Sequence, residues 1–137
     1  MKEFFLALFF AKSMLLTPGG VDLINEWKKI PLHEPLEAIT RGAAIYVDVS
    51  THVDAGLSID RLDETFPAGM VEVRLVHKDG QETLLTNSSA YSFEDGKVYL
   101  ILNAADGVPT GKEFTGLYVR SAKPLSRVSL VWRNHRK

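Results

Sequence analysis

Hydrophobic and polar residues alternate with a period of two over most of the chain that follows Gly42. In the first such stretch, Ile45, Val47 and Val49 are separated by polar or aromatic residues. Because successive side chains of a strand point to opposite faces, this pattern predicts half-buried β-strands. The later stretches of the same character are residues 71–75, 83–86, 91–93, 98–102, 114–120 and 127–133. The alternation therefore predicts an all-β protein.

Turn residues separate these stretches and indicate how neighbouring strands pair. Asp79-Gly80 and Asp95-Gly96 each lie between alternating segments, which is a strong short-range signal for a β-hairpin. Val98–Leu102 is apolar on both faces, so we expect this strand to be central, with its outer side covered by an N-terminal helix. The last two strands, ending in Arg120 and Arg133, are expected to pair with each other.

About seven short antiparallel strands at this spacing are typical of a β-sandwich or a partly open barrel. We predict an antiparallel β-sandwich, immunoglobulin-like or jelly-roll-like, preceded by one or two helices. The resemblance to immunoglobulin-like sandwiches is architectural, because the cysteine pair of antibody domains is missing from this chain.

The first residues form a hydrophobic segment. Phe4–Ala11 is apolar throughout, Lys12 and Ser13 interrupt, and Met14–Leu16 is apolar again. A short apolar stretch after Lys2 is typical of a secretory signal. A helix over residues 4–16 would be about 20 Å long, less than the roughly 30 Å of a bilayer core. We expect an export signal or membrane contact through residues 4–16; the alternative is a helix that packs on its own domain or on another subunit in the cytoplasm.

Residues 18–42 are predicted to link this segment to the strands. Apolar residues recur at helical spacing from Val21 to Ile30, Asp22 is a suitable N-cap and Pro31 a terminator. The pattern predicts a short amphipathic helix followed by an extended connector that ends at Gly42. The chain then divides into a hydrophobic segment (1–17), a helix with connector (18–42) and a β-sandwich domain (43–137).

Composition and motifs exclude several chemistries. The chain has no cysteine and a formal net charge of −1, so thiol nucleophiles, disulfides and thiolate metal sites are absent, and no global charge recruits nucleic acid. The His-Glu-x-x-His, Gly-x-Ser-x-Gly and phosphate-loop patterns are missing as well. We predict no cofactor and no catalytic residue on these grounds.

One polar series is the best candidate for metal or acid–base chemistry. Asp48, Ser50, His52 and Asp54 alternate along one predicted strand, so all would project from one face about 6.5–7 Å apart. Asp48, His52 and Asp54 could ligate a divalent cation if further ligands came from elsewhere, and the acidic residues after position 59 are the nearest candidates. The competing interpretation is the solvated side of an ordinary strand.

Two kinds of residue suggest partner binding. Tyr46 and Tyr118 fall on the more polar side of their strands and could contact a protein or a glycan. After Glu113 the chain has no acidic residue, and an anionic surface could bind the basic residues there, unless they are solvated strand faces and a tail. These basic candidates are Arg120, Arg127, Arg133, Arg136 and Lys137.

The sequence therefore favours a non-catalytic binding or accessory β module, exported or membrane-tethered, that docks a protein or a glycan. One alternative is a metal-dependent module or small enzyme built on Asp48, His52 and Asp54. The other is a cytosolic structural protein that uses its N-terminal helix as a subunit interface.

Overall fold

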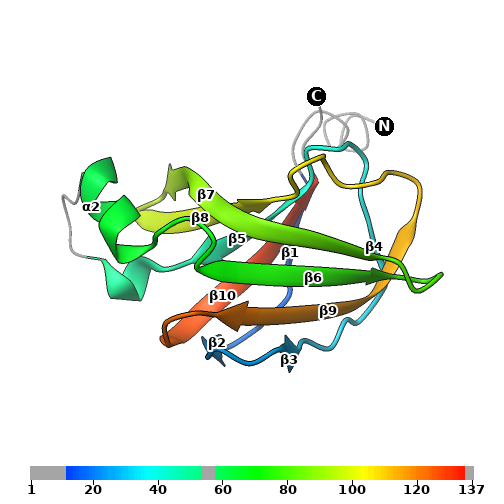
Figure 1. The fold of residues 1–137 in the computed structure, drawn as a ribbon, viewed down its shortest axis with the longest axis horizontal. Coiled ribbons are helices and arrows are strands. Elements are labelled where there is room, and N and C mark those ends of the chain that lie inside the picture. The colour runs from blue at the N-terminus through cyan, green and yellow to red at the C-terminus, as the bar shows by residue number, and fades with distance from the viewer. Residues whose placement is uncertain (1–11, 54–57, 135–137) are drawn as a thin grey trace.

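The structure, a computed structural model, describes residues 12–53 and 58–134. Within them, antiparallel strands form one curled sheet, and the strand order is β1-β10-β5-β8-β7-β6-β9-β3, with β2 beside β10 and β4 beside β9 (Figure 1). The strands are β1 (Lys12–Leu15), β2 (Val21–Leu23), β3 (Lys28–Lys29), β4 (Leu36–Glu37), β5 (Ala44–Asp48), β6 (Val71–His77), β7 (Glu82–Glu94), β8 (Lys97–Asn103), β9 (Glu113–Ser121) and β10 (Leu125–Asn134). A single 3-10 turn, η1 (Ser50–His52), and one α-helix, α2 (Ile59–Thr65), complete the described elements.

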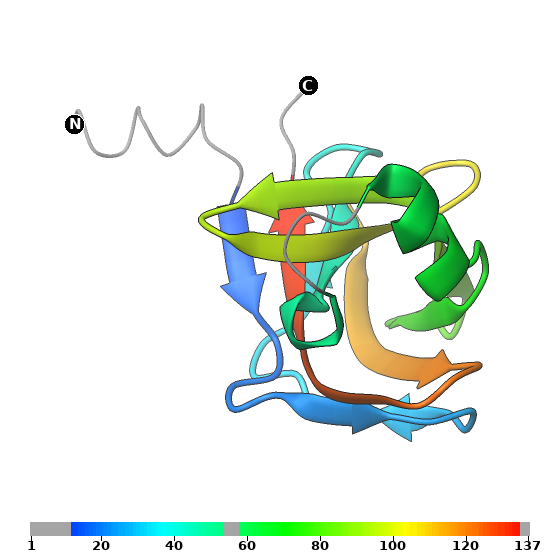
Figure 2. The same ribbon diagram turned by 90° about the vertical axis from the view of Figure 1, so that its left-hand side faces the viewer.

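The all-β antiparallel prediction is confirmed, but the strand pairing forms a half-barrel and does not show the two sheets of a sandwich. The reason lies in β7, which pairs with β6 through Glu82–Thr86 and with β8 through its second half. Its register shifts between Asn87 and Tyr91, and such a bulge bends a strand. This one long strand therefore joins both halves of the sheet, and seen end on the strands surround the core (Figure 2).

Both predicted hairpins are present. Asp95 and Gly96 have φ of 50° and 76°, the two left-handed residues that a type I′ turn requires. At the other hairpin, Gly80 N donates to His77 O at 2.9 Å, and Gly80 has φ 93°. That turn is a type I turn closed by a left-handed glycine, the three-residue alternative.

The predicted helix over Val21–Ile30 is wrong. This segment forms β2 and β3, which pair with β10 and β9, and the Asp22 carboxylate accepts a hydrogen bond from Arg127 N instead of capping a helix. Ser121 N donates to Ile24 O, and Ile30 N to Leu117 O. A helix would have used its hydrogen bonds internally and left the edges of β9 and β10 unpaired, so tertiary pairing overrides the helical spacing.

The expected pairing of the last two strands is also wrong. β9 pairs with β6, β3 and β4, while β10 pairs with β1, β2 and β5. The chain crosses from one half of the curled sheet to the other between Ser121 and Leu125. β8 is central as predicted, because it lies between β5 and β7. The alternative of a helix over residues 4–16 is wrong for Lys12–Leu15, which form strand β1 and pair with β10; residues 4–11 lie outside the described residues.

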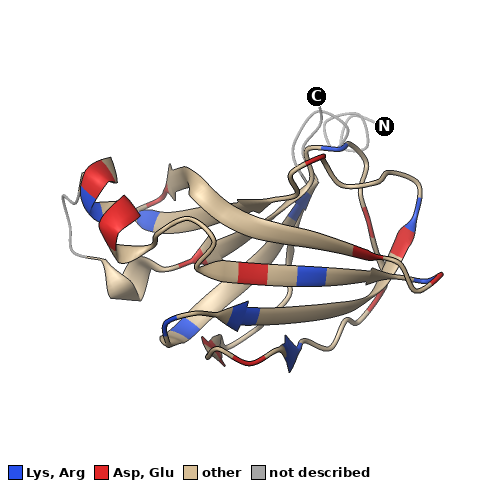
Figure 3. Cartoon of the chain, viewed as in Figure 1, with Lys and Arg blue, Asp and Glu red and all other residues tan. Residues whose placement is uncertain are grey.

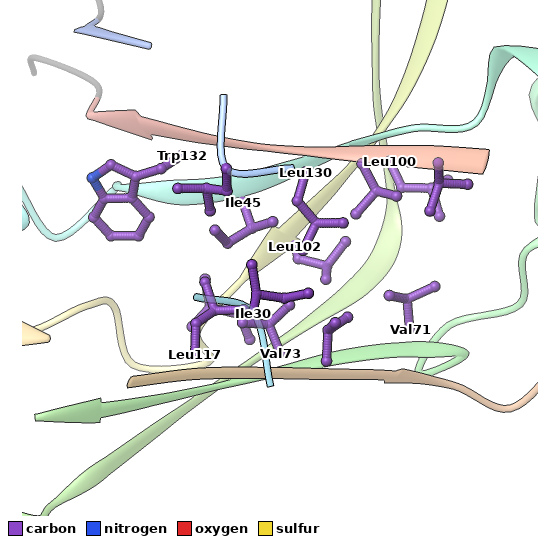
Figure 4. Packing of buried hydrophobic residues seen from close by; sticks show 14 of the residues in the cluster. Ile30, Ile45, Val71, Val73, Leu100, Leu102, Leu117, Leu130 and Trp132 are labelled. Atoms are coloured by element: carbon purple, nitrogen blue, oxygen red, sulfur yellow. The ribbon is translucent and has the colours of Figure 1, made fainter. Parts of the chain in front are cut away.

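The core lies between the two halves of the sheet. Side chains of β10, β5 and β8, among them Trp132 and Leu102, point toward Val73 of β6 and Leu117 of β9 (Figure 4). Residues on both sides of the predicted boundaries at 17/18 and 42/43 take part: Leu16 and Leu36 are buried, 7% and 1% exposed, and belong to the same core as Leu100. The described part of the chain is thus one folded unit from β1 onward.

Candidate functional site

A group of aromatic and charged side chains gathers on the outer face of β6 and β9. Arg74 alternates with the buried Val73 and Leu75, and Tyr118 with buried neighbours on β9, so both point away from the core. The register places Arg74 opposite Tyr118 and Glu72 opposite Arg120. In Figure 3 an acidic and a basic position stand close together on β6, with basic positions on the neighbouring β9 and β3.

Trp27 completes this group from the segment between β2 and β3. The guanidinium carbons of Arg120 and Arg74 lie 4.4 Å and 4.8 Å from the centroid of the Trp27 ring. The Arg74 carbon is also 4.6 Å from the Tyr118 ring. Each cation–π contact contributes about 0.5–1 kcal/mol at an exposed site. We call Trp27, Glu72, Arg74, Tyr118 and Arg120 the Trp27 surface.

The two arginines of the Trp27 surface differ in how their charge is compensated. Arg120 Nε donates to Glu72 Oε1 at 2.7 Å. Arg74 Nε lies 3.7 Å from Glu82 Oε2, too long for a hydrogen bond, and that nitrogen is buried without a hydrogen-bond partner. The Arg74 side chain is 30% exposed. Of the two arginines of this surface, Arg74 therefore has the weaker carboxylate pair, although its side chain is less exposed than that of Arg120, which is 37% exposed.

Tyr46 and Arg133 come together on the other half of the sheet. The Arg133 guanidinium carbon is 4.4 Å from the Tyr46 ring centroid, and its two terminal nitrogens donate to Glu94 at 2.6 and 2.7 Å. Burial raises the pKa of Tyr46, and the hydrogen bonds that Arg133 donates to Glu94 raise the pKa of Arg133. Tyr46 is only 6% exposed, so this cluster stabilises the sheet and leaves little aromatic surface for a glycan.

The described basic candidates do not form a common patch. Arg120 and Arg133 lie on different halves of the sheet and each is paired with a carboxylate. Arg127 is exposed at a backbone φ of 54° near the start of β10. Arg136 and Lys137 lie outside the described residues. The three described candidates are therefore not assembled into one site, and the anionic-surface hypothesis stays a prediction.

The straight strand on which the metal hypothesis depended is not formed. β5 ends at Asp48, whose Oδ1 accepts hydrogen bonds from Ser50 N at 3.0 Å and Ser50 Oγ at 2.5 Å as the chain turns into η1. His52 Nε2 contacts the carbonyl oxygen of Ser126 at 2.7 Å. Asp54 lies outside the described residues. Within residues 12–53 and 58–134, no three His, Asp or Glu side chains are grouped closely enough to hold a metal ion.

A second polar group joins α2 to the bulge of β7. The Asp63 carboxylate accepts hydrogen bonds from Ser89 Oγ at 2.7 Å and from Tyr91 Oη at 2.5 Å. Ser89 has φ 67°, a backbone conformation that non-glycine residues rarely adopt. The Tyr91 hydrogen bond, and then that of Ser89, lower the pKa of Asp63, while burial and the neighbouring carboxylate raise the pKa of Tyr91. This arrangement docks the helix on the sheet.

We expect this docking to weaken in acid. Because the pKa of Asp63 is lowered in the folded protein, its stabilising contribution is present above the ordinary value of 3.8 and is lost as pH falls through the folded pKa. Asp63→Asn should therefore be less stable than the natural chain at pH 7, and the difference should shrink below about pH 4. Urea unfolding at pH 7 and pH 3 measures this, with Tyr91→Phe as the matched variant that removes one donor. If the difference in unfolding free energy between Asp63→Asn and the natural chain is the same at pH 3 as at pH 7, the ionised Asp63 carboxylate is not the source of the stabilisation.

Sequence reasoning missed three residues of the Trp27 surface, namely Trp27, Glu72 and Arg74. Trp27 was assigned to the apolar face of a helix that does not form, and Arg74 was one polar position among many on an alternating strand. Only the register between β6 and β9 places Arg74 next to Tyr118. The predicted Tyr118 and Arg120 are the two members that the sequence pattern found.

Comparison with models of known protein families, with curated proteins and with solved structures finds no match to this chain. Among the described residues, no helix is long and apolar enough to cross a membrane.

Proposed function

We propose that the protein is a non-catalytic binding module that docks a partner protein on the Trp27 surface. The observation that carries this proposal is the clustering of Trp27, Tyr118 and two arginines on one outer sheet face. Tryptophan, tyrosine and arginine are the residues most enriched at the energetic centres of protein interfaces. Their rigid rings and planar guanidinium groups offer contact area at a small cost in conformational entropy.

The chemistry of the surface defines the partner further. Arg74 is held only loosely by Glu82, so a partner carboxylate that forms a bidentate pair with it gains two charge-assisted hydrogen bonds. Leu84 is opposite Arg74 on β7 and is 49% exposed, which gives the surface an apolar margin. We therefore expect a partner that presents an acidic residue beside an apolar one.

A protein fits this surface better than a glycan. A sugar ring stacks on an open aromatic face, but two guanidinium groups already lie over the Trp27 ring and one over Tyr118. Glycan binding would require these contacts to be given up. The glycan alternative is kept as an outcome of the experiment below.

Export or membrane attachment remains part of the proposal, and its support is the apolar segment Phe4–Ala11. The position of β1 limits where an export signal could be cleaved. Leu16 is buried and the Thr17 hydroxyl accepts a hydrogen bond from Leu130 N, so processing before β1 spares the sheet whereas processing after Thr17 removes a strand.

Affinity capture with matched variants tests the docking surface. The natural protein, Trp27→Ala, Arg74→Ala and the control Arg61→Ala, an exposed arginine on α2, are immobilised and exposed to extract of the source cells and to a glycan array. We expect a protein that the natural chain and Arg61→Ala retain and the other two lose, with an affinity at least about tenfold weaker, as for an interfacial hot spot.

Two results would contradict this function. One is that every captured protein is retained equally by Arg74→Ala and Trp27→Ala. The other is a glycan whose binding depends on Trp27 and Arg74, which would replace the protein partner by a sugar.

A further inference from the structure

β1 is the edge strand at one end of the curled sheet, and within the described residues it pairs only with β10. Leu16 N donates to Leu130 O, so the even-numbered residues of this segment direct their backbone groups toward β10. Along an antiparallel strand, residues whose backbone groups point to one neighbouring strand alternate with residues whose groups point to the other side. The N–H and C=O groups of Ser13 and Leu15 therefore point to the free edge. Such an edge is a template for an additional strand.

Two hollows run along this edge. One, of about 190 Å³, is lined by Met14, Leu16, Leu32 and their neighbours. The other, of about 410 Å³, is lined by Ser13, Met14, Leu36 and Trp132, among others. Both are lined by Met14 and Glu34, so the two hollows adjoin, and together we call them the groove. Its walls are the inward-facing side of β1 and the segment between β3 and β4.

The segment between β3 and β4, which forms the other wall of the groove, does not pair with β1. Pro31 and Pro35 line this wall, and proline has no N–H with which to pair β1. The sheet therefore stays open between β1 and this segment, which makes it a half-barrel. Leu15 and Ile39, 52% and 62% exposed, stand beside the opening.

The charge at the groove is acidic. Glu34 and Glu37 both line the larger hollow and are exposed. Neither forms an ion pair with another residue of the described ranges. Carboxylates that are exposed and uncompensated attract a basic residue.

We propose that the free edge of β1 takes up an extended peptide of a partner protein as an additional antiparallel or parallel strand. Main-chain hydrogen bonds to Ser13 and Leu15 supply the pairing, and apolar side chains at alternate positions of the peptide fill the two hollows. A flanking Lys or Arg of the peptide lies near Glu34 and Glu37. This surface is separate from the Trp27 surface and does not depend on its function.

The test uses the full chain and a synthetic acetylated, amidated peptide, Lys-Val-Ser-Leu-Thr-Phe-Lys, with a control in which glutamate replaces both lysines. Amide hydrogen exchange and chemical shifts are followed by NMR during titration. We expect the basic peptide to protect the amides of Ser13 and Leu15 and to bind at least about tenfold more tightly than the acidic one.

Two variants separate pairing from folding. Leu15→Pro removes the N–H on the free side of β1 and leaves the hydrogen bonds to β10 in place, a position that edge strands tolerate; it should weaken peptide binding at least about tenfold. Should this variant not fold, Glu34→Lys with Glu37→Lys leaves β1 unchanged and should reverse the preference between the two peptides.

Several results would overturn the proposal. The first is that the basic peptide does not bind. The second is that the variants bind it as tightly as the natural chain does. The third is that the chemical-shift changes are confined to another surface. Protection of the Ser13 and Leu15 amides in the free protein would overturn it too, because the edge would then already be paired, with a second copy if the protection depends on protein concentration.

Discussion

A chain that lacks residues 1–17 is expected to be largely unfolded at room temperature, whereas a chain that lacks only residues 1–11 is expected to fold. Removal of residues 12–17 deletes β1, the buried Leu16 and the Thr17 hydroxyl that accepts a hydrogen bond from Leu130 N at 2.9 Å. It also uncovers the edge of β10. The chain that begins at Lys12 keeps every described contact.

The expected loss follows from burial and pairing. A buried leucine contributes about 1.5–3 kcal/mol, each net hydrogen bond about 0.5–1.5 kcal/mol, and β1 supplies several of these bonds. The free energy lost when residues 12–17 are removed is therefore on the order of 5 kcal/mol. This loss is comparable with the whole free energy of unfolding of a small domain, about 5–15 kcal/mol.

Urea unfolding followed by circular dichroism measures this effect. The shorter truncation should unfold cooperatively near the midpoint of the full chain, while the longer one should show no cooperative transition. Equal midpoints for both truncations would show that β1 is not part of the stable sheet.

Trp132→Ala is expected to give the largest loss of stability of any single substitution in the core. Trp132 is 2% exposed and faces Phe114 edge-on, with 6.1 Å between ring centroids. It lies across from Met14 on β1 and Ile45 on β5, so it fills the space where three strands meet. Truncation of a buried tryptophan to alanine costs about 3–5 kcal/mol, because a cavity remains that the surroundings do not fill.

The chain contains its own control, since it has two tryptophans. Trp27 is half-buried on the outer face, and Trp27→Ala should cost only about 1–2 kcal/mol, the value of its two cation–π contacts. Chemical denaturation of both variants, with Trp132→Phe as a conservative substitution, makes the comparison. Equal losses at the two positions would contradict the assignment of Trp132 to the core and Trp27 to the surface.

Asn87 lies in a glycosylation pattern, but its side chain is buried and has a structural role. Asn87-Ser88-Ser89 has the pattern of a glycosylation acceptor, yet Asn87 is 2% exposed. Its Oδ1 accepts from Val71 N, and its Nδ2 donates to the carbonyl oxygens of Phe66 and Pro67. The amide therefore closes the bulge of β7 over the segment after α2, and a glycan on it would break these bonds.

The strands and turns could be predicted from the sequence because their signals are local. A period of two follows from the geometry of a single strand, and an Asp-Gly pair between two alternating stretches favours a hairpin turn. The missed helix α2 also has a local signal, Ser58 at its N-cap with its Oγ accepting from Arg61 N. At seven residues it is too short for its apolar spacing to be recognised.

The candidate surfaces could be predicted only in part. The sequence pattern identified Tyr118 by its place on the more polar side of a strand, and Arg120 as one of the basic residues after Glu113. Trp27 and Arg74 reach them only through the pairing of β6, β9 and β3. The groove beside β1 likewise exists only because two segments far apart in sequence approach each other.

By itself, then, the sequence determined that this chain forms antiparallel strands, where most of them lie and where two hairpins turn, since these depend on interactions between near neighbours. The tertiary structure alone decided that Val21–Ile30 is extended and that β9 and β10 are not partners. It decided as well that the Asp48 carboxylate accepts hydrogen bonds within a turn and that His52 contacts Ser126 of β10. It also decided that one long bent strand joins both halves of the sheet. These outcomes depend on which edges compete for the same backbone hydrogen bonds, and that competition is settled only when the whole sheet has formed.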